Sequence, residues 1–186
     1  MKVIQIKSYN GLNIQSLELL GKGTQGSVYK INDNRCIKIF KKETAFKEEL
    51  HSLLIAQIDN HFPRLYEYGD NYIIRELVSG ISLDNYLKVN PLDLNVCNKI
   101  IEIYNAMNYV GYSRLDSALF HLFLLSNNNI KIIDTAKAMK KKYSYPRILL
   151  HDLDKLNFKN KFLKFVKINH SDLYSNWQKL SKNFKE

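Results

Sequence analysis

The first 77 residues alternate apolar and polar side chains in short runs, and this period of two constrains the fold more than any other feature of the sequence. Turn signals such as Asn10-Gly11 and Gly69-Asp70-Asn71 separate the runs and favour sharp reversals of the chain. Strands are predicted over residues 3–6, 17–20, 27–31, 36–40, 64–68 and 72–77. The runs open as an antiparallel meander, and the last two complete a predicted five-stranded sheet.

Between the fourth and fifth of these strands the period changes to that of a helix, over residues 44–58. One helical stripe carries Phe46, Leu50, Leu53, Leu54 and Ile58, and Thr44 is available as the N-cap. Beyond Gly80 we predict helices over residues 82–88, 94–109, 147–156, 161–166 and 173–180, and one hairpin over 119–125 and 130–133. The sequence thus predicts an α+β chain, in which a sheet with one helix precedes a mostly helical half.

A glycine-rich segment, Gly21-Lys22-Gly23-Thr24-Gln25-Gly26-Ser27-Val28, lies between two of the predicted strands. The same glycine spacing before a helix would indicate a dinucleotide-binding turn, whereas strands on both sides favour a flap over nucleotide phosphates. Glycines suit such a flap because a backbone without side chains approaches phosphate groups closely. An ordinary hairpin turn is the alternative interpretation.

Lys38 is the only charged residue in the strand Cys36–Phe40, which is otherwise apolar on both faces. A lysine in such a strand needs an anionic partner. The predicted helix offers Glu48 and Glu49, and Glu49 has the better spacing for pointing toward the sheet. A Lys38–Glu49 pair with a purely structural role is the alternative.

These features resemble those of the protein-kinase-like superfamily, and the resemblance runs through residues 15–137 in the order typical of that family. The resemblance implies a single two-lobed kinase-like domain over residues 1–186, with the sheet in an N-lobe (1–78) and a reduced, mostly helical C-lobe (79–186). It also implies that Lys38 holds the α- and β-phosphates of ATP, with Glu49 as its helix partner. The nucleotide would further contact the flap and a hinge that meets adenine, through Gly21, Gly23, Gly26, Val28, Glu76 and Val78.

The segment from Arg114 to Leu124 resembles the catalytic loop of the family. Asp116 stands at the position of the catalytic base, and His121 stands where the family has an asparagine. Thirteen residues after His121, Asp134 ends a predicted strand, as the metal-binding aspartate of the family does. The resemblance therefore implies that Asp116 orients the acceptor hydroxyl, and that Asp134 and His121 hold Mg²⁺ or Mn²⁺.

The chain also departs from the family pattern. Thr135-Ala136 replaces Phe-Gly after the metal-binding aspartate, so we do not expect regulation by flipping of this loop. Only 50 residues follow Ala136, without an Ala-Pro-Glu segment, which resembles small atypical kinases of the bacterial type with a truncated C-lobe. Arg75 precedes the hinge at a position that is usually apolar, and it leaves the identity and the affinity of the nucleotide open.

Charge is distributed unevenly along the chain. The net charge is +10, and residues 137–186 carry 13 basic but only 4 acidic side chains. The run Lys140-Lys141-Lys142 is either a solvated loop or a surface that recognises an acidic protein, RNA or an anionic membrane lipid. Cys36 and Cys97 are predicted to be reduced core thiols. No apolar run is long enough to span a membrane, and we expect a soluble cytoplasmic protein.

The resemblance implies an ATP-dependent transferase that phosphorylates a hydroxyl, with serine or threonine of an unknown, possibly acidic, protein as the acceptor. Two alternatives belong to other functional classes. One is a pseudokinase that binds a nucleotide as a scaffold, and the other is a small-molecule or lipid-headgroup kinase. At this stage the acceptor and the oligomeric state stay open.

Overall fold

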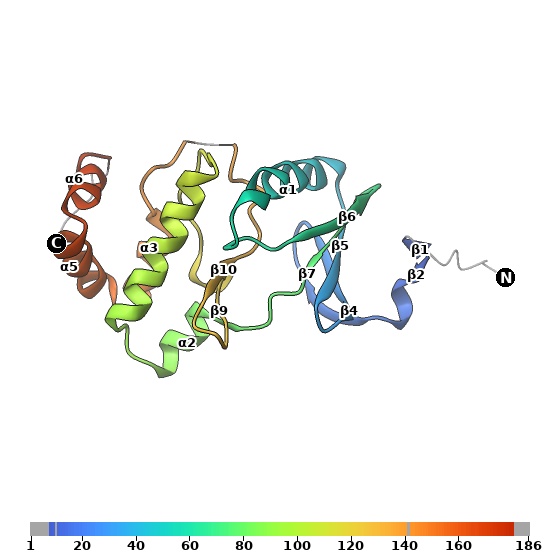
Figure 1. Ribbon diagram of the computed structural model, residues 1–186, viewed down its shortest axis with the longest axis horizontal. Coiled ribbons are helices and arrows are strands. Elements are labelled where there is room, and N and C mark those ends of the chain that lie inside the picture. The colour runs from blue at the N-terminus through green and yellow to red at the C-terminus, as the bar shows by residue number, and fades with distance from the viewer. Residues whose placement is uncertain (1–7, 10, 141, 181–186) are drawn as a thin grey trace.

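The computed structural model describes residues 8, 9, 11–140 and 142–180, and a strand-rich part is followed by a helical part (Figure 1). The strand predicted over residues 3–6 lies outside the described residues. In the strand-rich part, five strands form one antiparallel sheet in the order β3-β4-β5-β7-β6. These strands are β3 (Glu18–Lys22), β4 (Gly26–Asn32), β5 (Arg35–Phe40), β6 (Leu65–Gly69) and β7 (Tyr72–Glu76). The predicted antiparallel sheet of five strands is therefore confirmed.

The centre of this sheet is β5, which pairs with β4 on one side and with β7 on the other. Cys36 and Ile37 of β5 are fully buried, and helix α1 (Glu43–Ile55) packs against this strand. Lys38 lies directly opposite Ile73 of β7. Opposite residues of an antiparallel pair share a face, and Ile73 packs with Leu53 of α1 in one apolar cluster, so Lys38 lies on the side that α1 covers.

The sequence predicts the position of helix α1 and part of its inward face. Lys42 is the N-cap and makes no side-chain capping bond, so the predicted capping role of Thr44 is wrong. Three residues of the predicted stripe are confirmed, because Leu53 is buried and Phe46 and Leu50 pack against the same apolar cluster. Leu54 and Ile58 are exposed, so the stripe is wrong at these two positions. The buried residues of α1 also include Glu49 and Ser52, which meet polar partners.

The helical part follows the predicted element order closely. The described helices there are α2 (Leu83–Val89), α3 (Leu94–Tyr109), α4 (Arg147–Lys155), α5 (Lys159–Asn169) and α6 (Ser171–Leu180). The predicted hairpin forms β9 (Leu122–Leu124) and β10 (Ile130–Ile132), and β8 (Ile81–Ser82) joins them in a three-stranded sheet. Two short strands, β1 (Ser8–Tyr9) and β2 (Leu12–Asn13), pair near the start of the chain. Three 3₁₀ segments complete the described elements: η1 (Ile14–Ser16), η2 (Ala56–Ile58) and η3 (Leu119–His121).

One large apolar core holds the helical part together, and α3 runs through it. Trp177 of α6 packs edge-on against Tyr104 of α3, with ring centroids 5.3 Å apart. Phe62, which precedes β6, belongs to the same core and contacts Tyr112, so the strand-rich part is anchored in it. Cys36 and Cys97 are both buried and unpaired. No helix within the described ranges is both long and apolar enough to cross a membrane.

Candidate functional site

The Lys38 ammonium meets the Glu49 carboxylate between β5 and α1. Both side chains are almost fully buried, with 9% and 4% of their surfaces exposed. Burial raises the pKa of the Glu49 carboxyl, while the nearby Lys38 charge opposes that rise. A buried pair of this kind stabilises a fold weakly, so Lys38 and Glu49 are candidates for a functional role.

Asp134 lies beside this pair, with Oδ1 3.8 Å from Lys38 Nζ. Its backbone has a φ of 57°, in the left-handed region that side-chain-bearing residues seldom adopt. Such strain persists only where the surrounding structure enforces it, and it is concentrated at functional sites. The Asp134 side chain keeps 36% of its surface exposed, so it is accessible to a ligand.

His121 and Asp134 meet because the β9–β10 hairpin brings its two ends together. His121 precedes β9, Asp134 follows β10, and Ile133 N donates to His121 O at 2.9 Å. His121 Nε2 lies 3.6 Å from Asp134 Oδ2. Burial lowers the pKa of the His121 imidazole, so the ring is neutral near pH 7 and has a nitrogen lone pair available.

His121 and Asp134 are the described residues at this point that could hold a divalent cation. Asp134 supplies carboxylate oxygens and His121 a neutral nitrogen, and no group of three potential metal ligands exists among the described residues. Mg²⁺ commonly takes one or two protein ligands and completes its octahedron with water and phosphate oxygens. The nitrogen ligand would suit Mn²⁺ better than Mg²⁺.

Asp116 is bonded to backbone amides at the start of α4. Its Oδ1 accepts from Ile148 N at 3.0 Å and from Leu149 N at 3.3 Å, and its Oδ2 accepts from Ile148 N at 3.1 Å. Burial raises the pKa of Asp116, and the hydrogen bonds from the backbone amides oppose the rise. The described contacts thus tie Asp116 to α4, whereas Lys38, Glu49, Asp134 and His121 contact one another.

The glycine-rich segment forms the tip of the β3–β4 hairpin. Packing requires glycine at position 26, because a Cβ there would lie only 2.0 Å from Ile39 O. A Cβ at Gly21 or Gly23 would have no atom within 4 Å, so packing does not require glycine at these two positions. Val28 lies directly opposite Lys38 and shares its face of the sheet.

The linker that runs from Glu76, the last residue of β7, to Val78 makes several backbone hydrogen bonds within the protein. Glu76 N donates to Arg64 O at 2.8 Å, and Leu77 N donates to Asn34 O at 3.0 Å. The Glu76 carbonyl accepts from Arg75 Nη1 at 2.9 Å. The backbone groups of Val78 have no such partner among the described contacts, although its side chain is buried.

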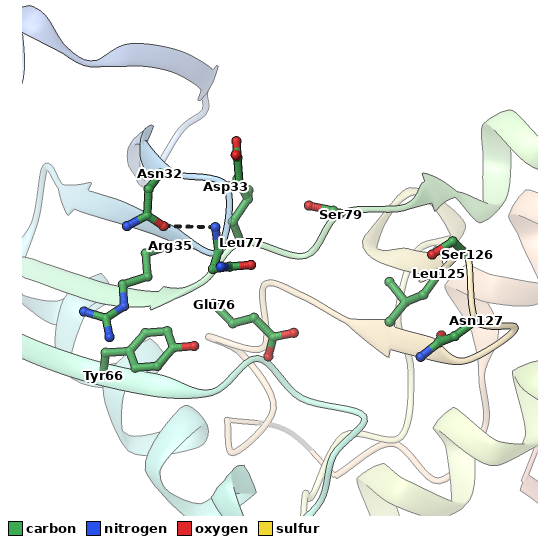
Figure 2. A pocket seen from close by; sticks show the side chains of 11 residues that line it. Asn32, Asp33, Arg35, Tyr66, Glu76, Leu77, Ser79, Leu125, Ser126 and Asn127 are labelled. Carbon is green, nitrogen blue, oxygen red and sulfur yellow. Dashed lines mark hydrogen bonds between the residues drawn. The ribbon is translucent and has the colours of Figure 1, made fainter.

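A polar groove of about 750 Å³ lies along this linker. Figure 2 shows the β4–β5 turn on one side, the β9–β10 turn on the other, and Glu76 between them. Arg35 stacks on Tyr66 at its sheet end, 4.3 Å from the ring centroid. Lys38, Asp134 and His121 do not line this groove, so it is separate from the charged cluster.

Ser52, Tyr112 and Asp152 also make contacts next to the cluster, and no sequence motif predicted them. Ser52 Oγ lies 3.1 Å from Thr135 Oγ1, and Tyr112 Oη donates to Ser52 O at 2.9 Å. Asp152 of α4 accepts from Leu119 N at 3.2 Å, just before His121. These partners are distant in sequence, so no local motif could have revealed them.

Glu48 and Glu49, the two candidate partners of Lys38 in the sequence, have different partners in the structure. Glu49 takes Lys38, and Glu48 pairs with Lys140 at 2.5 Å. The Lys140 side chain is 55% exposed. At least one lysine of the basic run therefore contacts α1 within the same molecule.

Comparison with known proteins identifies two distant similarities, and no family model matches the chain. The chain is 26% identical over 131 residues to YrzF of Bacillus subtilis (strain 168), provisionally named a serine/threonine-protein kinase. It is 28% identical over 138 residues to zyg-1 of Caenorhabditis briggsae, named a probable serine/threonine-protein kinase. The aligned regions cover 66% and 68% of this chain but 60% and 19% of the two relatives. The similarities suggest a distant kinase-like relationship.

Proposed function

We propose that this chain is a minimal two-lobed kinase that transfers the γ-phosphoryl group of a nucleoside triphosphate to a hydroxyl. ATP is the donor in the family that it resembles, and serine or threonine of a protein is the proposed acceptor. One observation carries the proposal: Lys38, Glu49, His121 and Asp134, from three separate regions of the chain, converge on one point. We place the lobe boundary between residues 78 and 79.

In the proposed reaction, this chain positions charges around the triphosphate. Lys38, held by Glu49, would contact the phosphates beneath the glycine-rich hairpin, and Asp134 with His121 would hold a divalent cation. The bound cation would neutralise charge on the phosphate oxygens. The acceptor oxygen attacks the γ-phosphorus, and the bond from that phosphorus to the bridging oxygen breaks. Preorganised charges stabilise this transition state without reorganisation of the protein.

Asp116 is the proposed acceptor of the hydroxyl proton. A carboxylate has about four lone-pair sites, and the α4 amides use two on Oδ1 and one on Oδ2. One site on Oδ2 is left for a substrate hydroxyl. The raised pKa of the carboxyl makes it a better proton acceptor than an ordinary aspartate.

A nucleotide-binding scaffold without catalysis is the second candidate. The Asp116 contacts favour it, because the amides of α4 give this aspartate a structural role that needs no substrate. The two candidates bind nucleotide alike and differ only in turnover.

Incubation of the purified chain with a γ-labelled triphosphate and Mg²⁺ or Mn²⁺, alone and with cell extract, tests the proposal. We expect label on the chain or on an extract protein, and its loss in Asp134→Asn. Nucleotide binding without transfer would support the scaffold instead. Transfer that is unchanged in Asp134→Asn would refute the kinase assignment.

A further inference from the structure

Arg75 is a buried cation that forms no close ion pair with a carboxylate of the described residues, although its charge also acts on Glu49. It is only 7% exposed, and its one described hydrogen bond runs from Nη1 to the carbonyl of Glu76 at 2.9 Å. A guanidinium has five N–H donors. No Arg75 nitrogen is among the fully enclosed, unpartnered polar atoms of the described residues, so the donors that Arg75 does not use stay reachable and are available to an acceptor on a ligand.

The strand register places Arg75 at the base end of the proposed nucleotide site. Arg75 lies opposite Cys36, and Lys38 lies opposite Ile73, so Arg75 and Lys38 share one face of the sheet. They are one pleat repeat apart, about 7 Å along the strand direction. If Lys38 holds phosphates, Arg75 lies beside the linker, where the base would bind.

Arg75 also changes the hydrogen-bonding character of the linker. The Glu76 carbonyl accepts from Arg75 Nη1, and Cys36 Sγ lies 3.7 Å from the same oxygen. A carbonyl oxygen has two lone pairs, and both are therefore engaged. An amino group at position 6 of a purine would find no free acceptor there, and it would face the donors of Arg75.

A purine with a carbonyl oxygen at position 6 has the complementary pattern. Its O6 and N7 are both acceptors, and arginine commonly pairs with these two atoms of guanine. We propose that Arg75 determines base specificity and makes this chain prefer 6-oxopurine nucleoside triphosphates, such as GTP and ITP, over ATP. This inference rests on the proposed function, because it assigns the base of the same nucleotide site.

Equilibrium binding of ATP, GTP and ITP to the wild-type chain, Arg75→Met and Arg64→Met tests the inference. Arg64 is exposed and contributes only backbone groups to the described contacts, so Arg64→Met is the matched control. We expect GTP and ITP to bind about tenfold more tightly than ATP in the wild type and in the control. Arg75→Met should lose this preference, because it removes the donors and frees the Glu76 carbonyl for an amino group.

The results separate failure of the inference from failure of the proposed function. ATP binding more tightly than GTP to the wild type, or a ratio unchanged in Arg75→Met, would overturn the base assignment and leave the kinase proposal intact. Tight binding of GTP with weak binding of ITP would also overturn the base assignment, since the 2-amino group of guanine, and not the 6-oxo group, would then determine the specificity. No binding of any triphosphate to the wild type would refute the proposed function itself. Circular dichroism establishes that each variant is folded.

Discussion

At the scale of single residues, the charged cluster allows catalysis to be separated from stability. Asp134 is partly exposed, whereas Lys38 is buried against Glu49. The Asp134→Asn variant should therefore lose phosphoryl transfer by about 10²-fold or more and keep its melting temperature, because it removes a charge that acts on the transition state. Radiolabel transfer and thermal unfolding are the measurements.

Lys38→Met should lose both activity and stability. Removal of one member of a buried ion pair leaves the Glu49 charge uncompensated, at a cost of about 3 kcal/mol. The double variant Lys38→Met/Glu49→Gln should recover much of the stability and none of the activity. Recovery of transfer in the double variant would contradict the role of Lys38, and Lys47→Ala, on the outer face of α1, serves as the control.

His121 gives a pH dependence whose sign follows from its environment. Burial lowers the pKa of the folded imidazole, so the unfolded chain binds this proton more readily. Stability should therefore decrease as pH falls below about 6.5, the value of an unperturbed ring. In NMR titrations of the metal-free chain, His121 should titrate below pH 6.5, and a pKa above this value would contradict the effect of burial.

In activity assays, His121→Asn should shift metal use from Mn²⁺ toward Mg²⁺ if His121 is a ligand.

At the scale of elements, Asp116 links the segment before β9 to the first turn of α4. Asp116→Ala should destabilise the protein by about 2 kcal/mol, because amides of Ile148 and Leu149 lose a buried acceptor. Asp116→Asn keeps one acceptor oxygen and should be less destabilised. If Asp116 also accepts the hydroxyl proton, Asp116→Asn will lose transfer far beyond its loss of folded protein; activity in proportion to folded protein indicates a purely structural role.

The pair between Glu48 of α1 and Lys140 shows that the basic run also acts within the molecule. Replacement of Lys140, Lys141 and Lys142 by glutamine should weaken association with an anionic partner more at low salt than at high salt. Glu48→Gln removes only the contact to α1, and it should leave that association unchanged. An equal effect of both changes would assign the lysines to positioning of α1.

At the scale of the whole molecule, Glu76 joins the strand-rich part to the helical part. Its carboxylate lies 2.6 Å from Lys131 Nζ of β10 and accepts from Arg64 N at 3.0 Å. Lys131→Met should lower stability by about 1 kcal/mol and the melting temperature by about 2–4 °C, since this pair is only partly buried. Calorimetry should still give one transition, because Phe62 anchors the sheet in the large core; two separated transitions in the wild type would contradict this coupling.

The sequence by itself determined the order and type of the elements, because hydrophobic period and turn residues act locally. Helix α3 begins and ends at the predicted residues, and the five strands of the sheet lie where alternation predicts them. The sequence also singled out Lys38 and Glu49, since a charge in an apolar strand needs a nearby partner. The joint role predicted for His121 and Asp134 came from the family resemblance and not from the local pattern.

Only the tertiary structure decided which side chains each element turns inward and what they contact. The apolar stripe predicted that Leu53 of α1 lies inward, but the same face also carries Glu49, which meets Lys38, and Ser52, which meets Thr135 and Tyr112, while Leu54 and Ile58 are exposed. Asp116 has the spacing of a catalytic base, but its contacts with α4 arise from a helix 31 residues further along. The proposed role of Arg75 likewise depends on its burial and on its hydrogen bond to the Glu76 carbonyl. Such contacts depend on packing between distant segments, and local sequence patterns do not encode them.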